Sequence, residues 1–221
     1  MAGAPLVAAP ANDWRLFEVG FGAADAFERG HIPGAGYIDT SELESGPLWN
    51  KVPDGALEQV LLGHGIRHGV TVALYRRLLD SGVAAWNRVG LALAQGRARG
   101  HPQALDFGVA FPARPDYLVD MPLARRLLSG ADGALVSIRT WNETIGKTSG
   151  YSYIDARGDS VPAFHRGDGC TKPCAEIEHM WRAGGAGAYT VFYCGTGWRA
   201  SLAFFYAWLM HWERIGVYDG S

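Results

Sequence analysis

Cysteine is scarce in this sequence of 221 residues, which contains only Cys170, Cys174 and Cys194. Three cysteines cannot build a disulfide framework, so the fold does not depend on one. With 48% hydrophobic and 19% charged residues, the chain has the composition of an ordinary globular protein with a buried apolar core. All three cysteines lie in the second half, so the first half has no thiol with which to do chemistry.

An excess of charge is also missing, because the formal net charge is only -2 at pH 7. This near balance gives no reason to expect nucleic acid or an anionic membrane as a partner. No apolar run is long enough to span a bilayer, and the first ten residues lack the basic start of a secretory signal. We therefore expect a cytoplasmic protein, or a periplasmic one whose signal is not part of this sequence.

Short apolar runs alternate with segments of helical spacing along the chain. Strands are expected at residues 14–19, 37–39, 70–75, 134–138, 189–193 and 215–218. Helices are expected at residues 23–29, 52–64, 83–93, 122–129, 175–183 and 200–212, and a long polar loop at residues 148–174. This alternation predicts an α/β protein with doubly wound parallel sheets and flanking helices.

Two prolines in the stretch AFPARP, residues 110–115, interrupt the pattern and predict a linker. The order of elements then repeats at a spacing of about 100 residues, the size of a small domain. LFEVGF and LVSIRT open the two halves, and VALYRR and VFYCGT occupy matching later positions. We therefore divide the chain into two domains, residues 1–112 and residues 113–221.

The most informative stretch is YTVFYCGTGWRAS, residues 189–201. An apolar strand run ends at Cys194, a glycine-spaced loop follows, and a helix pattern begins soon after. This order places the cysteine at the edge of an α/β sheet where ligands bind. Unpaired N–H groups and the positive dipole end of the helix favour thiolate over thiol there. Gly195 and Gly197 let successive N–H groups point at one anionic sulfur.

Four strings carry a resemblance that covers nearly the whole chain: GHIPGA at residues 30–35, VFY in the strand, CGTGWR at residues 194–199, and VYDG at residues 217–220. The chain resembles the rhodanese family of sulfurtransferases. It is most similar to bacterial members with several rhodanese repeats, in which PLWN, HGIRH, TSGYSYI and CGTGWRAS recur. The resemblance implies two rhodanese-like domains and thiosulfate sulfurtransferase activity. It also implies a cysteine persulfide, formed from thiosulfate or a similar donor and discharged to cyanide or another thiophilic acceptor.

The residue types in the loop agree with that chemistry. Cys194 supplies the nucleophile, and the N–H groups of residues 195–199 can hold an anionic persulfide. Arg199 can bind an oxyanionic donor with paired hydrogen bonds. Thr196 adds a hydroxyl donor, and Trp198 adds an apolar wall at the rim. Catalysis is therefore assigned to Cys194 and substrate binding to the loop residues Gly195, Thr196, Gly197, Trp198 and Arg199.

Three other interpretations of the loop stay open. A free cysteine is often a buried structural thiol. Cysteine phosphatases also place a cysteine-led loop before a helix, but with five residues between cysteine and arginine, whereas four stand here. The third alternative is a non-enzymatic persulfide carrier or interaction module that docks a partner protein, such as a sulfur acceptor.

Arginines outside the loop are weaker candidates. Arg76 stands where the second half has its cysteine, so the first half is interpreted as an inactive supporting domain. Arg76 and Arg77 can attract an anionic donor or form a solvated basic pair. Arg139 is a candidate for supporting the substrate-binding residues without touching substrate itself. Ser137 stands where the family usually has an acidic residue near this arginine, and Glu143 stands where some relatives have a substrate arginine.

Cys170 and Cys174, with His165 and His179 nearby, have a spacing that fits zinc poorly. They can also be a redox or sulfur-relay pair, or incidental surface cysteines. We expect no metal and no cofactor.

Overall fold

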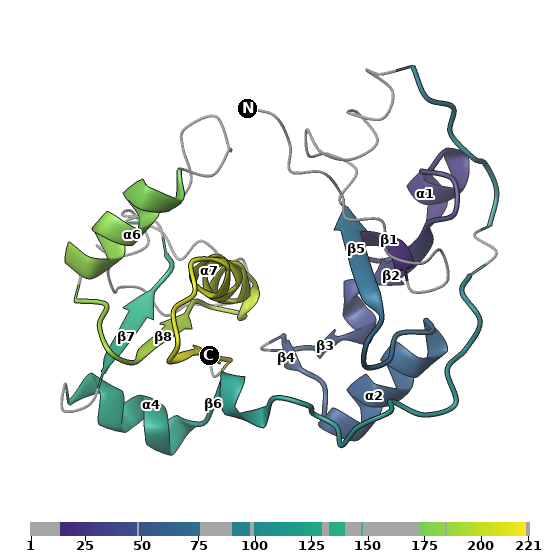
Figure 1. Ribbon diagram of the computed structural model, residues 1–221. Coiled ribbons are helices and arrows are strands. Elements are labelled where there is room, and N and C mark those ends of the chain that lie inside the picture. The colour runs from purple at the N-terminus through teal and green to yellow at the C-terminus, as the bar shows by residue number, and fades with distance from the viewer. Residues whose placement is uncertain are drawn as a thin grey trace. The chain divides into compact units, whose positions relative to one another are not determined.

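The computed structural model describes residues 14–47, 49–75, 90–97, 100–129, 133–139, 147, 173–183 and 185–219. It divides into two compact units, residues 1–45 with 51–113 and residues 46–50 with 114–221. Strands and helices alternate along both units (Figure 1). The mixed α/β class with parallel sheets is confirmed, whereas the two-domain division at residue 112 stays a prediction.

The described part of the first unit is built on a parallel sheet of three strands, with β1 in the middle between β2 and β5. The strands are β1 (Trp14–Gly20), β2 (Gly36–Asp39) and β5 (Thr71–Tyr75), and a separate short sheet pairs β3 (Glu44–Ser45) with β4 (Asn50–Lys51). Outside residues 76–89 and the other ranges left undescribed, the helices of this unit are α1 (Asp25–Arg29), η1 (Thr40–Glu42) and α2 (Asp54–Gly63). Every strand predicted in this half is therefore present.

The GHIPGA stretch fastens α1 to this sheet. His31 stacks on Phe27 with ring centroids 3.8 Å apart, and its Nδ1 atom lies 3.0 Å from the Phe27 carbonyl oxygen. The N–H of Ile32 donates to the Tyr75 hydroxyl, 3.3 Å away. Because His31, Phe27 and Tyr75 are all buried, the motif has a structural role in this unit.

The helix predicted at residues 83–93 is wrong at its end. Residues 83–89 lie outside the described residues, but residues 90–93 are not helical. Gly90 has φ +75°, a left-handed conformation in which a helix does not continue. Ala94 then exchanges two backbone hydrogen bonds of 2.9 Å with His31 in an antiparallel bridge.

The described residues of the second unit form four parallel strands in the order β6, β9, β8, β7. They are β6 (Leu118–Val119), β7 (Ala134–Ser137), β8 (Thr190–Tyr193) and β9 (Ile215–Tyr218). Where this unit is described, its helices are η2 (Pro115–Tyr117), α4 (Met121–Leu128), α6 (Cys174–Ala183) and α7 (Trp198–Leu209). The predicted strand–helix order of this half is confirmed where the chain is described.

Helices pack on both faces of this sheet, because alternate residues of a strand point to opposite sides. Val191 of β8 packs with Leu127 of α4 on one face. Phe192, the next residue, packs with Trp181 of α6 and Ala203 of α7 on the other. In Figure 1, α4 accordingly lies on the opposite side of β7 and β8 from α7. Within the described residues, no helix is long and apolar enough to cross a membrane.

Candidate functional site

Cys194 is the first residue after β8, and α7 begins four residues later at Trp198. β8 lies between β7 and β9, so the cysteine stands at the carboxyl edge of an interior strand. Parallel pairing places Ser137 and Tyr218 on either side of Tyr193, the residue before Cys194. This edge is where ligands bind in open α/β sheets, as the sequence predicts.

The loop from Cys194 to α7 is tightly packed. Cys194 is only 5% exposed and Thr196 only 8% exposed, whereas Trp198 is 45% exposed. The thiol belongs to the core cluster that contains Phe192 and Ala200. Cys194 is therefore buried while Trp198 is half-exposed, and the rim role of Trp198 stays a prediction.

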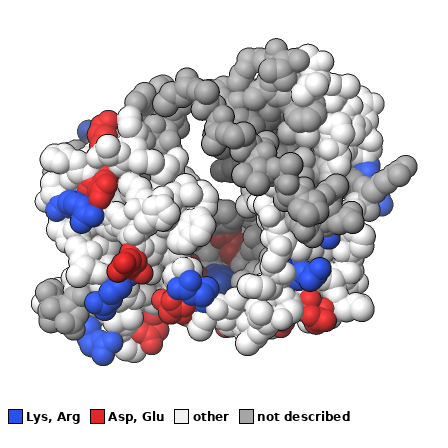
Figure 2. Space-filling view, viewed as in Figure 1, with Lys and Arg blue, Asp and Glu red and all other residues white. Residues whose placement is uncertain are grey.

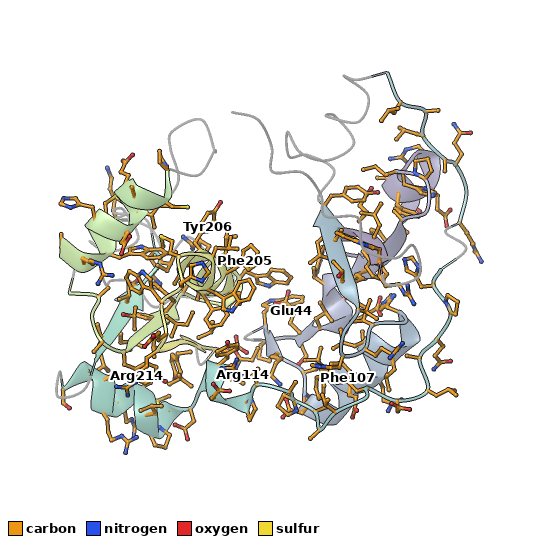
Figure 3. All side chains as sticks on the ribbon, in the orientation of Figure 1. Glu44, Phe107, Arg114, Phe205, Tyr206 and Arg214 are labelled. Atoms are coloured by element: carbon orange, nitrogen blue, oxygen red, sulfur yellow. The ribbon has the colours of Figure 1, made fainter. Side chains whose placement is uncertain are left out.

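The face of α7 that packs on the sheet consists of small residues. Ala200, Ala203 and Ala207 are completely buried, and their short side chains let the helix approach β8 and β9 closely. The outer face is apolar as well, because Leu202, Phe205, Trp208 and Leu209 are exposed and Phe205 stacks on Trp208 with centroids 6.0 Å apart. Phe205 is labelled on this helix in Figure 3, and the surface over α7 is white in Figure 2.

Gly197 cannot be another residue without strain. It is the N-cap of α7 and has φ +76°, in the left-handed region that favours glycine. A Cβ atom at this position would also stand 2.6 Å from Oδ1 of Asp219, closer than real Cβ contacts come. Both observations support a loop whose backbone conformation is fixed.

Two arginines lie near this edge of the sheet. Arg199 is in the first turn of α7 and Arg139 follows β7 by two residues, and both are half-buried. Ser137 is 1% exposed, and its Oγ atom has no hydrogen-bond partner among the described residues. A serine hydroxyl at position 137 cannot form the ion pair with Arg139 that an acidic residue there would form. The role of Arg139 stays a prediction.

The remaining candidates lie elsewhere or outside the described residues. Arg76, Arg77, Glu143, His165 and Cys170 are not among the residues that the structure describes. Cys174 is exposed as the first residue of α6, and His179 is exposed on the same helix. Among the described residues, no three His, Cys, Asp or Glu side chains are grouped as metal ligands.

Asp219 is a site residue that the sequence reasoning missed. It follows β9 directly, is half-buried, and brings its carboxylate against Gly197. The string VYDG contains it, but nothing in that string indicates which loop it meets. The available signal was topological: an acid just after a strand that pairs with β8 must lie near the cysteine loop.

Comparison with known proteins identifies a curated relative and similar solved structures. No family model matches the chain. A curated relative, the thiosulfate sulfurtransferase YnjE of Escherichia coli strain K12, is 42% identical over 99% of this chain and 59% of its own length. A crystal structure of YnjE has a TM-score of 0.85 over 97% of this chain and 61% of that chain. The chain is therefore similar over nearly its whole length to a member of the rhodanese family, and it spans about three fifths of the YnjE sequence.

Two further solved structures are similar at lower identity. An anaerobic ergothioneine biosynthesis enzyme from Chlorobium limicola, in complex with trimethyl histidine, is 29% identical with a TM-score of 0.84 over 99% of this chain and 64% of that chain. A structure of EanB, described as a cysteine persulfide in a tetrahedral intermediate state with ergothioneine, is 28% identical with a TM-score of 0.82 over 99% of this chain and 63% of that chain.

Proposed function

We propose that the chain is a sulfurtransferase that moves sulfane sulfur from thiosulfate or a similar donor to a thiophilic acceptor through a persulfide on Cys194. The observation that carries this proposal is the buried thiol at the carboxyl end of β8, followed by a glycine loop and the start of α7. The name of the YnjE relative and the persulfide described for EanB support it. In this proposal residues 1–112 and 113–221 are two rhodanese-like domains, and only the second is catalytic.

Sulfur transfer takes two displacements. The Cys194 thiolate attacks the outer sulfur of thiosulfate and forms a new S–S bond. The S–S bond of the donor breaks, and its electron pair leaves with sulfite. Cyanide then attacks the outer sulfur of the persulfide and forms the C–S bond of thiocyanate. The electron pair of the broken S–S bond returns to Cys194 as thiolate, so no outside oxidant or reductant is needed.

The other loop residues serve the anions in these steps. N–H groups at the start of α7 and in the loop favour negative charge on sulfur. Arg199, in the first turn of α7, offsets the repulsion between an anionic donor and the thiolate. Thr196 contributes a hydroxyl from a buried position, and Trp198 limits access from solvent.

Cysteine variants test the proposal. Cys194→Ser should abolish thiocyanate formation from thiosulfate and cyanide, because serine forms no persulfide. Cys174→Ser is the matched control, since Cys174 is exposed outside the loop, and a joint change of Cys170 and Cys174 should also retain most activity. Substantial thiocyanate formation by Cys194→Ser would refute the mechanism.

A second candidate function is a persulfide carrier that docks a partner protein with an acceptor thiol. The exposed apolar residues of α7, which begin at Trp198 beside the cysteine loop, favour this candidate. A carrier would take up one sulfur per chain from thiosulfate and turn over cyanide poorly. Repeated turnover with thiosulfate and cyanide alone would favour the enzyme.

A further inference from the structure

Asp219 meets the catalytic loop from a neighbouring strand. β9 and β8 are parallel neighbours with Tyr218 opposite Tyr193, so Asp219 and Cys194 leave the sheet at the same edge. The Asp219 side chain is half-buried, and its Oδ1 atom occupies the space into which a Cβ on Gly197 would project. The carboxylate therefore packs on the backbone of Gly197, the residue that directly precedes α7.

The N-terminus of α7 lacks a side-chain cap of its own. Its N-cap is Gly197, which offers no side-chain hydrogen bond to the first N–H groups of the helix. Those groups have no partners within the helix, and the dipole there favours a negative charge. Asp219 is placed to do from β9 what a capping aspartate or serine does from within the chain.

We propose that Asp219 is a positioning residue of the cysteine loop. Its carboxylate holds Gly197 in one conformation, and thereby fixes where the loop N–H groups meet the Cys194 sulfur. This proposal rests on the proposed sulfurtransferase function. Because Asp219 is itself acidic, it does not attract an anionic donor, so its loss should slow sulfur loading without weakening donor binding.

Single-turnover loading with thiosulfate separates these effects. Asp219→Ala should lower the maximal rate of persulfide formation about 10-fold or more, because misplaced reacting groups are costly. The thiosulfate concentration for half-maximal loading should stay the same or fall. Asp219→Asn keeps the shape and one acceptor oxygen and should recover most of the rate. Glu213→Gln, an exposed acid just before β9, is the matched control and should load normally.

Two results of that experiment would overturn the proposal. One is an unchanged maximal loading rate in Asp219→Ala, and the other is a raised half-maximal concentration at an unchanged rate. If Asp219→Ala does not fold, Asp219→Glu serves instead, since its longer side chain must push against Gly197. Loading by Asp219→Glu at the full original rate would equally overturn the proposal.

A double-mutant cycle tests the contact itself. A methyl group at position 197 would meet Asp219 Oδ1 and also strain a left-handed backbone. Gly197→Ala should therefore slow loading strongly in the original chain and less strongly when combined with Asp219→Ala. Equal slowing in both backgrounds would show that the two residues do not act on each other.

Alkylation of the thiol tests loop positioning without any sulfur transfer. Cys194 is 5% exposed, so a loosened loop should react faster with iodoacetamide. Exposed Cys174 in the same chain is the internal reference. We expect Asp219→Ala to raise the ratio of Cys194 to Cys174 alkylation several-fold, and an unchanged ratio would overturn the proposal. If the original chain takes up no sulfur, the proposed function fails, yet this ratio still decides the role of Asp219.

Discussion

The backbone N–H of Ile138 donates a hydrogen bond to the carbonyl oxygen of Tyr193, 2.8 Å away. This bond continues the parallel pairing of β7 and β8 one residue past the end of β7, up to the residue before Cys194. Tyr193 is paired with Tyr218 of β9 on its other side. Cys194 therefore leaves a strand that is held on both sides, and the loop begins from a fixed point.

Arg199→Ala should slow the loading of Cys194 far more than its discharge. Loading brings an anionic donor to an anionic thiolate, and loss of a charged hydrogen bond there costs about 1.5–3 kcal/mol. That cost corresponds to a loss of roughly 10- to 150-fold in catalytic efficiency for thiosulfate. Discharge to cyanide should change little, because the sulfite group has already left.

Stopped-flow measurement of both half-reactions checks the role of Arg199. Arg182→Ala is the matched control, because Arg182 pairs with Glu178 on the exposed side of α6. If loading and discharge slow equally in Arg199→Ala, the arginine holds the loop in place and does not bind the donor.

Trp181→Phe should destabilise the chain much less than Trp181→Ala. Trp181 is completely buried and packs on Phe192 with ring centroids 4.8 Å apart, so truncation to alanine should cost about 3–5 kcal/mol. Its Nε1 atom is buried with no hydrogen-bond partner among the described residues. Phenylalanine therefore loses packing but no hydrogen bond to the described part of the chain, and it removes a desolvated donor. Urea unfolding of both variants checks this, and equal costs would contradict it.

His101 should make the chain less stable in mild acid. Burial lowers the pKa of His101 below its ordinary value of 6.5. A hydrogen bond to the Leu16 carbonyl opposes this shift, whereas nearby Arg15 and His64 lower the pKa further. The His101 side chain therefore binds a proton more readily in the unfolded chain than in the folded one. The stability contribution of neutral His101 is present above pH 6.5 and is lost as the pH falls through the lower pKa of the folded state.

The free energy of unfolding, measured across this pH range, tests the histidine. His101→Gln should reduce the fall in the free energy of unfolding at low pH. His68→Gln, which changes an exposed histidine of the same unit, should leave that fall as in the original chain. A decline that His101→Gln does not alter would show that another group is responsible.

Asp120→Ala should destabilise α4 by about 1 kcal/mol, the usual cost of losing an N-cap. The Asp120 carboxylate accepts a hydrogen bond of 2.9 Å from the N–H of Leu123. Asp120→Asn keeps an acceptor and should cost only a small part of that. Thermal unfolding checks both variants, and equal destabilisation by the two would argue that charge and not the hydrogen bond matters.

The strands and most helices were predictable because each has a local cause. The runs that form β1, β5, β8 and β9 are short and mostly apolar. α7 differs from its predicted range of residues 200–212 at both ends. It starts at Trp198 because Gly197 takes a left-handed conformation, and it ends at Leu209, just before His211 with φ +60°.

The candidate site was only partly predictable. Cys194 and its loop could be found because strand, glycines and helix follow one another in the sequence. Asp219 could not be found in this way, because its meeting with Gly197 depends on β9 lying beside β8. The two-residue strands β3, β4 and β6 were also missed, because they are too short for an alternating pattern to appear.

Intact mass spectrometry of the chain tests the central claim most directly. After exposure to thiosulfate, the account predicts a gain in mass of one sulfur atom per chain, located on the peptide that contains Cys194. Subsequent cyanide should remove that mass and release an equal amount of thiocyanate. Cys174→Ser should behave identically, and Cys194→Ser should gain nothing. A chain that gains no sulfur, or one that gains it on Cys170 or Cys174, would contradict the account.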